Sequence, residues 1–320
     1  MKSLKTVLVV EYMFGTNIKV HFAGCERNFV FESALDAGVK YGLFSVFPFI
    51  SHHFEIPAYQ MHKYKGELGK QTIDILKSQI GDTRHMIMDS GLFTLMFGSQ
   101  KGKRDEKFMT IWMEKLCEFV ISQNIKATCV ETDCQKILGV DAAWRLRERM
   151  KCILRNNRII NVFHLEDGAR GLDRLIEYSE YIAISVPELR IRFGLGKEYQ
   201  NATIRFANYI KNKKPNIDIH LLGCTTMDLL KSCKFCTSSD STSWMGFVRY
   251  GSNKFGSESK QRNISSIKAE RMNEMLPEMQ RRFANRGINE SESVAKYAVA
   301  YSISAKDHLN RYEKNIGSQR

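Results

Sequence analysis

The chain has 320 residues, too many for one small domain and suited to a (β/α)8 barrel with additions, because such barrels take about 250 residues. Hydrophobic residues make up 43 % of the chain, enough for a large core, and no run approaches the roughly 20 apolar residues of a membrane span. The formal net charge of +13 favours a polyanionic partner, and nucleic acid above all, through phosphate neutralisation and counterion release.

The amino-terminal residues lack the apolar core and cleavage site of a signal peptide. The eight cysteines are scattered over a long chain and follow no disulfide spacing. We therefore expect reduced thiols and a cytoplasmic protein, in the host cytoplasm if a phage encodes the chain.

Short apolar runs rich in β-branched residues alternate along the chain with polar or amphipathic stretches. The expected strands are Ile18–Ala23, Gly42–Phe47, His85–Asp89, Ala127–Glu131, Ile159–His164, Tyr181–Ser185, Ile217–Leu222 and Phe235–Asp240. The expected helices between them are Lys107–Gln123, Ala142–Leu154, Leu172–Tyr178, Ala202–Ile210 and Met227–Lys231. Strands that alternate with helices pair in parallel through crossovers, and eight such units favour closure into a TIM-like α/β barrel. An open doubly wound sheet is the alternative.

The two ends of the chain differ from this pattern. Residues 6–23 are expected to include an amino-terminal hairpin that belongs to the barrel. After the eighth strand, Gly251–Ser259 is rich in Gly and Ser and indicates a mobile loop, followed by helical stretches at Ile264–Arg286, where Pro277 should introduce a kink, and at Val294–Leu309. We therefore expect a barrel over residues 1–250 and a basic helical extension, packed on the barrel, over residues 251–320.

Acidic side chains stand at several expected strand ends. Asp89 ends the third strand, Glu131 ends the fourth with Asp133 two residues beyond it, and Asp240 ends the eighth. The active site of a barrel of this class forms at the carboxyl ends of its strands, so these acids would crowd one face and raise each other's pKa. A single Asp after a strand is as often the N-cap of the next helix, and the coincidence at several strand ends is what favours a catalytic role.

Three segments, in order, carry a resemblance to a known family. Met88-Asp89-Ser90-Gly91-Leu92-Phe93 resembles the Asp-Ser-Gly-Gly-Phe signature of the tRNA-guanine transglycosylases. Tyr181-Ile182-Ala183-Ile184-Ser185 is similar to the family's Tyr-Ala-Ile-Gly strand, and His220-Leu221-Leu222-Gly223 is similar to its His-Leu-Met-Gly segment. Asp240 then matches the nucleophilic aspartate, and the correspondence covers roughly residues 85–245.

The resemblance implies a pentosyltransferase that exchanges a base by double displacement, with the logic of a retaining glycosidase. Asp240 would attack C1′ of a guanosine and form a covalent glycosyl-enzyme, and Asp89 would act as the general acid/base. The remaining implied base-binding residues are Ser90, Gly91, Glu131 or Asp133, His164, Ser185 and Gly223. The alternation of strand side chains favours Glu131 over Asp133, and His164 stands where the family has a base-recognising glutamine.

Departures from the family pattern shift the implied substrate from tRNA to DNA. The family has a zinc cluster of three cysteines and a histidine after the nucleophile, whereas this chain has no cysteine after Cys236. Cys233 and Cys236, with Cys224 and His220, form only a weak zinc-like pattern, so we expect neither a metal nor a cofactor. The chain is more similar to the phage and bacterial 7-deazaguanine DNA transglycosylases.

On this interpretation the partners are DNA, with its guanosine flipped out or single-stranded, and a free 7-deazaguanine base of the preQ0 kind. The phosphate contacts are expected from two basic groups: Lys101, Lys103 and Arg104 after the third strand, and Lys254, Lys260 and Arg262 after the eighth. The alternatives are a transglycosylase that acts on RNA, a non-catalytic DNA-binding subunit of a partner protein, and a glycosylase that cleaves without replacing the base.

Overall fold

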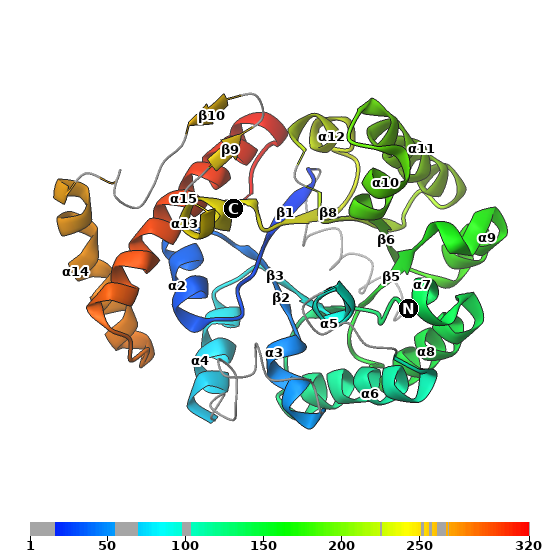
Figure 1. Ribbon diagram of the computed structural model, residues 1–320, viewed down its shortest axis with the longest axis horizontal. Coiled ribbons are helices and arrows are strands. Elements are labelled where there is room, and N and C mark those ends of the chain that lie inside the picture. Colours follow the sequence, from blue (N-terminus) through cyan, green and yellow to red (C-terminus); the bar gives the residue numbers. More distant parts are fainter. Residues whose placement is uncertain are drawn as a thin grey trace, which may run out of the picture. The chain divides into compact units, whose positions relative to one another are not determined.

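The computed structural model describes residues 17–54, 70–97, 104–224, 226–250, 253–255, 258–260, 267 and 269–319. Eight parallel strands close into a barrel in chain order, from β1 to β8, so the predicted fold class is confirmed (Figure 1). The strands are β1 (Lys19–Ala23), β2 (Tyr41–Ser45), β3 (His85–Asp89), β4 (Thr128–Val130), β5 (Ile159–Phe163), β6 (Tyr181–Ser185), β7 (Asp218–Leu222) and β8 (Ser238–Ser241).

Helices follow the strands, as the alternation predicts. The main ones are α2 (Asn28–Asp36), α4 (Lys70–Gly81), α5 (Leu92–Phe97), α6 (Glu106–Ser122), α8 (Val140–Ile153), α9 (Gly168–Tyr178), α10 (Val186–Phe193), α11 (Lys197–Lys213) and α12 (Met227–Ser232). Shorter helical elements are α3 (Phe47–Ile50), η1 (Ser51–His53), α7 (Gln135–Leu138), η3 (Leu165–Asp167), η4 (Ser243–Met245) and α13 (Gly246–Tyr250). The sequence interpretation missed α2, α4, α5 and α10, which are short or only partly apolar.

The chain divides into two compact units. Unit 1 comprises Met1–Leu43, Asp74–His85 and Gly223–Arg320, and unit 2 comprises Phe44–Ile73 and Met86–Leu222. Unit 1 is therefore assembled from three separate stretches of sequence. Unit 2 carries β4 to β7 on one continuous stretch.

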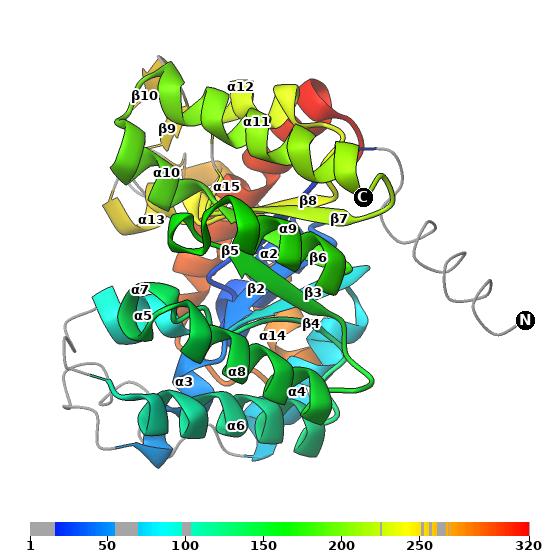
Figure 2. The ribbon, with the colours of Figure 1, turned by 90° about the vertical axis from the view of Figure 1, so that its right-hand side faces the viewer.

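In unit 2 the strands pair in register from β3 to β7. Ile87 pairs with Thr128, Cys129 with Ile159, and Tyr181 with Asp218. The apolar side chains of these strands are buried beneath the surrounding helices, which include α10 and α11, packed against each other (Figure 2). This frame fixes the carboxyl ends of β4, β5 and β6, from which the polar side chains described below extend.

In unit 1, β1 pairs with β8 through Val20 and Ser239, and with β2 through Phe22 and Gly42. Helix α15 (Glu292–Ile316) packs along α2 (Figure 1), and α14 (Ala269–Arg286) packs on α15. The buried Gln319 side chain closes the chain onto β1: its amide donates to the Ile18 carbonyl at 3.0 Å, and its oxygen accepts from the Val20 N–H at 2.8 Å. Gln319 thus satisfies backbone groups at the start of β1 and just before it.

The segment predicted as a mobile loop is ordered in its described parts. Asn253–Phe255 (β9) and Glu258–Lys260 (β10) pair as antiparallel strands, so the loop prediction was wrong there. Gly and Ser between two short strands are also typical of a hairpin turn, which the composition alone does not distinguish from a loop. The part of the predicted amino-terminal hairpin before residue 17 lies outside the described residues. Within the described chain, no helix is both long enough and apolar enough to cross a membrane.

Candidate active site

Asp89 lies at the carboxyl end of β3 and is held by the turn that follows it. Its Oδ2 accepts a hydrogen bond from the Gly91 N–H at 3.0 Å, and its carbonyl accepts one from Val46 N at 2.9 Å. Gly91 has φ +74°, and a Cβ there would lie 2.9 Å from the Phe47 Cβ. Only glycine combines that backbone conformation with that close approach. The Asp-Ser-Gly sequence is therefore a tight turn that fixes the carboxylate.

Ser90 is buried in the same turn. Its Oγ accepts a long bond from the Leu92 N–H at 3.4 Å, at the start of α5, and its carbonyl accepts from the Trp112 indole Nε1 at 2.8 Å. The indole bond ties the turn to α6. In the structure Ser90 thus serves the turn before α5, and contact with a base stays a prediction for Ser90 and Gly91.

Asp240 lies in β8, whose four residues Ser238–Ser241 are all polar and all buried. Its Oδ1 accepts a hydrogen bond from the Gly223 N–H at 2.6 Å, directly after β7. Gly223 has φ +61°, a left-handed conformation that glycine adopts without strain. Asp240 and Asp89 are thus arranged alike, each in the carboxyl-terminal half of a barrel strand with one carboxylate oxygen held by a glycine N–H.

Glu131 does not fit the base-binding role that strand alternation favoured. Its carboxylate forms a bidentate ion pair with Arg147, at 2.7 Å to Nε and 2.6 Å to Nη2, and both side chains are almost fully buried. It also accepts from Asn161 Nδ2 at 2.5 Å and from the Val162 N–H at 2.9 Å. With four donors on its two oxygens, Glu131 joins α8 to β5 and has no capacity left for a ligand. This outcome favours the other alternative, Asp133.

Asp133 belongs to a chain of polar side chains that we call the relay: Asp133, His164, Glu188 and Lys136. His164 is buried between two carboxylates, with Nε2 at 2.9 Å from Asp133 Oδ2 and Nδ1 at 2.7 Å from Glu188 Oε2. Glu188 Oε1 in turn contacts Lys136 Nζ at 3.0 Å and accepts from the Leu165 N–H at 3.2 Å. The relay therefore joins the carboxyl ends of β4, β5 and β6.

Burial acts against a charged His164, but the hydrogen bonds to Asp133 and Glu188 and their negative charges outweigh it and raise the pKa of His164 to about 10. Burial likewise acts to raise the pKa of Glu188, and its bond to His164 prevails and lowers that pKa. At neutral pH the imidazole is thus a cation that holds Asp133 in place. Both ring nitrogens of His164 are occupied within the relay, whereas Asp133 is 17 % exposed and is the more exposed of the two carboxylates.

Three relay-region side chains also come close enough to hold a metal ion. Ligand atoms of His164, Glu166 and Glu188 lie within 4.8 Å of one another. Both ring nitrogens of His164 contact carboxylates and Lys136 contacts Glu188, so a metal ion here would have to replace these contacts. Cys224, Cys233 and Cys236 form no disulfide, and none of them belongs to a metal-ligating group among the described residues.

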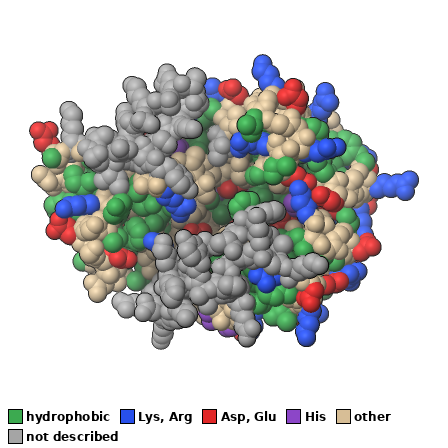
Figure 3. Space-filling view, viewed as in Figure 1, with side chains coloured by type: hydrophobic (Ala, Val, Ile, Leu, Met, Phe, Trp, Pro, Cys, Tyr) green, Lys and Arg blue, Asp and Glu red, His purple; other side chains and the backbone are tan. Residues whose placement is uncertain are grey.

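The remaining predicted residues have uneven support. Ser185 is buried at the carboxyl end of β6, immediately before α10, and makes no side-chain cap there. Arg104 is described and lies over the Phe108 ring, 4.6 Å from its centroid. Lys101, Lys103 and Arg262 lie outside the described residues, and only the backbone is described for Lys254 and Lys260. On the face in Figure 3, described Lys and Arg side chains are interspersed with Asp and Glu side chains.

Sequence reasoning missed Glu188, Lys136 and Arg147. A signal existed for Glu188, because Ser185-Val186-Pro187-Glu188 places Pro and an acid in the first turn of a helix directly after a strand. No local pattern indicated that Arg147, in the middle of α8, pairs with Glu131.

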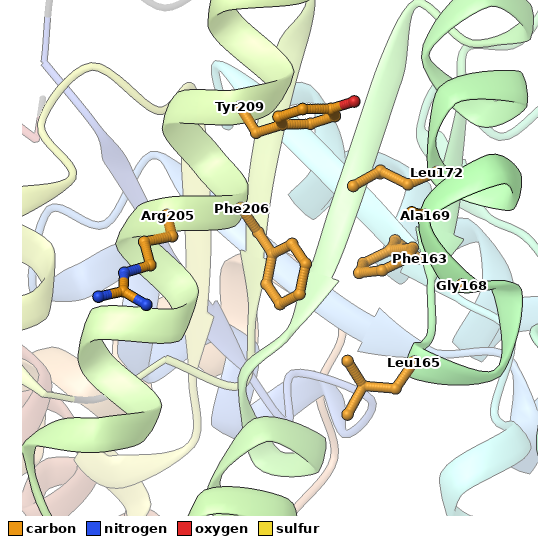
Figure 4. A pocket seen from close by; sticks show the side chains of 8 residues that line it. All are labelled: Phe163, Leu165, Gly168, Ala169, Leu172, Arg205, Phe206 and Tyr209. Carbon is orange, nitrogen blue, oxygen red and sulfur yellow. The ribbon is translucent and has the colours of Figure 1, made fainter.

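A separate pocket of about 370 Å³ lies on the outer side of β5, between α9 and α11 (Figure 4). Phe163, Leu165 and Leu172 line it together with Phe206, and Arg205 and Tyr209 add its polar groups. Phe163 faces this pocket, whereas the next residue, His164, extends to the relay, because successive side chains of extended backbone point to opposite sides. The pocket is thus distinct from the candidate site.

Comparisons with known proteins give no family. No protein-family profile matches the chain, and no curated protein sequence matches it. Two solved structures of the carboxyl transferase domain of Rhizobium etli pyruvate carboxylase, one with pyruvate and one with 3-bromopyruvate, share 9 % identity with TM-scores of 0.41 and 0.40. The two alignments cover 97 and 96 % of this chain but only 52 and 49 % of the carboxyl transferase chains. This chain therefore spans about half of their length. The hydrogenase maturase HydG of Carboxydothermus hydrogenoformans shares 13 % identity over 97 % of this chain and 83 % of its own, with a TM-score of 0.39. Likenesses at these TM-scores carry no argument about function.

Proposed function

We propose that the chain is a DNA base-exchange enzyme that replaces guanine with a 7-deazaguanine through a covalent Asp-glycosyl intermediate. The observation that carries the proposal is the matched arrangement of Asp89 and Asp240, each in the carboxyl-terminal half of a barrel strand and each held by a glycine N–H. Catalytic groups of barrel enzymes come from the ends of several strands, and double displacement at a sugar carbon requires two carboxylates with separate tasks.

In the first step Asp240 attacks C1′ of the target deoxyguanosine. The C1′–N9 bond breaks, its electron pair passes to the departing guanine, and the proton that guanine needs comes from Asp89. In the second step Asp89, now a carboxylate, removes the N9 proton of the incoming 7-deazaguanine. N9 then attacks C1′, and the ester bond to Asp240 breaks, which restores both side chains and retains the configuration.

The relay supports the choice of a purine as the exchanged base. A purine of the guanine type presents an amino group and a ring N–H on one edge, and a carboxylate accepts from both. Asp133, held by the His164 imidazolium, supplies such an acceptor from the end of β4. The high net charge favours a nucleic acid of either kind, and the missing cysteines after Cys236 favour DNA over tRNA as the polymer.

The test is incorporation of a labelled 7-deazaguanine into DNA. We expect the wild-type chain to place label in duplex or single-stranded DNA and, without an acceptor base, to form an adduct with DNA that survives denaturation. Asp240→Asn should abolish both, whereas the exposed Asp228→Asn on α12 should change neither. An adduct that survives Asp240→Asn would show that Asp240 is not the nucleophile.

The other outcomes separate the alternatives. Preferential labelling of tRNA would move the proposal to RNA, and abasic DNA without label would indicate a glycosylase. Failure to label any nucleic acid, with each available 7-deazaguanine and with partner proteins added, would refute base exchange.

A further inference from the structure

The connection between α10 and α11 exposes apolar side chains next to basic ones. We call residues 190–197, Arg190-Ile191-Arg192-Phe193-Gly194-Leu195-Gly196-Lys197, the elbow. Ile191 is 84 % exposed, Leu195 is 78 % exposed and Phe193 is 41 % exposed. Gly194 ends α10 with φ +81°, and Gly196 precedes α11, so the elbow is a short turn between two helices. Large apolar side chains this exposed on an ordered turn indicate a contact surface.

We propose that the elbow is a wedge that opens DNA: Ile191 and Leu195 enter the base stack beside the target nucleotide, while Arg192 and Lys197 contact its phosphates. The proposal rests on the base exchange proposed above, because a base inside a duplex is out of reach of a nucleophile and has to leave the stack. Proteins that unstack DNA commonly insert apolar side chains between base steps to fill the gap.

The basic residues of the elbow favour DNA over a protein or a membrane as its partner. Arg192 and Lys197 form no ion pair with any described residue, and of the two acids nearest in the sequence, Glu188 is paired within the relay and Glu198 stands beside Lys197. A protein-docking surface usually has few charges in its centre, whereas here each exposed apolar residue stands within two residues of a cation. Three apolar side chains also offer little area for insertion into a membrane.

The position of the elbow relates it to the relay. Glu188 and Ile191 are on the same helix, α10, three residues apart, which is a rise of about 4.5 Å at 1.5 Å per residue. The elbow therefore follows Glu188 by about one helical turn of the same element. This places the wedge next to the relay along the chain.

The experiment compares binding to two duplexes of one sequence, fully paired or with one abasic site, which removes most of the cost of unstacking. We expect the wild-type chain to prefer the abasic duplex about ten-fold, because part of the cost of unstacking is already removed in that duplex. The double variant Ile191→Ala/Leu195→Ala should lose this preference and keep its affinity for paired DNA within about two-fold. The control is Ile121→Ala on α6, which also shortens an exposed isoleucine, 54 % exposed, but lies outside the elbow. It should change neither value.

The charge variant Arg192→Gln/Lys197→Gln should weaken binding to both duplexes equally. It should reduce the slope of log affinity against log salt by about 2, the value for two lost phosphate contacts. Circular dichroism and urea unfolding of each variant show that the loss is not one of folding.

Three results would overturn the wedge: no abasic preference in the wild-type chain, a preference that survives the double apolar variant, or an effect of that variant only on self-association or on binding to anionic vesicles. None of these measurements needs a 7-deazaguanine or turnover. A wedge-dependent preference without base exchange would therefore refute the proposed function alone, and base exchange that is unaffected by the double apolar variant in paired DNA would refute the wedge alone.

Discussion

The buried Glu131–Arg147 pair should be among the most sensitive points of the fold. Glu131→Gln keeps the shape of the side chain but removes its charge. The buried Arg147 guanidinium then faces a neutral amide in place of a carboxylate. The side chains of the pair are only 3 and 1 % exposed, so water cannot replace the lost carboxylate, and Arg147 Nη1 already has no hydrogen-bond partner among the described residues. Removing one partner of such a pair costs about 3–5 kcal/mol. Against a typical total of about 5–15 kcal/mol, that is a large share of the free energy of unfolding.

The chain contains its own control in the pair between Glu106 and Arg145. This pair is also bidentate, at 2.7 and 2.8 Å, and also connects to α8, but its side chains are 45 and 59 % exposed. Because water screens and solvates both groups, Glu106→Gln should change the free energy of unfolding little. Urea unfolding of the two variants, with slopes compared to show that both unfold the same surface, measures the difference. A cost for Glu131→Gln no larger than that for Glu106→Gln would refute the reasoning from burial.

Two further predictions concern the relay and the Asp89 turn. The folded pKa of His164 is raised to about 10, above the ordinary value of 6.5, so its stabilising contribution is fully present below about pH 6.5 and is lost as the pH rises through about 10. His164→Gln should therefore destabilise the chain more at pH 6 than at pH 10 in urea unfolding, and an equal cost at both would contradict the raised pKa. Gly91→Ala should cost more than Gly139→Ala, because both have positive φ but only the Gly91 position brings a Cβ within 2.9 Å of Phe47. Thermal or urea unfolding checks this order, and equal costs would show that the turn relaxes.

The barrel could be predicted because its strands carry the pattern that burial imposes. Tyr181–Ser185 and His85–Asp89 match their expected bounds, since each is a short apolar run with a polar residue at its end. The eighth strand was displaced, from Phe235–Asp240 to Ser238–Ser241. Its four buried residues are Ser and Asp, and no hydropathy pattern identifies a strand whose burial depends on hydrogen bonds.

The site was predictable only in part, for a related reason. Asp89 and Asp133 could be named because they stand at the end of an expected strand or two residues beyond it. The choice between Glu131 and Asp133 depended on Arg147, which is 16 residues from Glu131 on another element, whereas strand alternation alone favoured Glu131, whose carboxylate the Arg147 pair occupies. The role of Glu188 likewise depends on His164, 24 residues earlier. Pairings of this kind are set by tertiary packing, which periodicity does not report.

The contact of Gln319 with β1 has a consequence for synthesis on the ribosome. The β4–β7 stretch of unit 2 is made without interruption and has its strand partners as it emerges. In unit 1, β1 emerges early but obtains its β8 partner only with Ser238–Ser241, and the backbone groups of Ile18 and Val20 obtain their Gln319 contacts about 300 residues after they are made. Unit 2 should therefore acquire protease resistance during synthesis before β1 does.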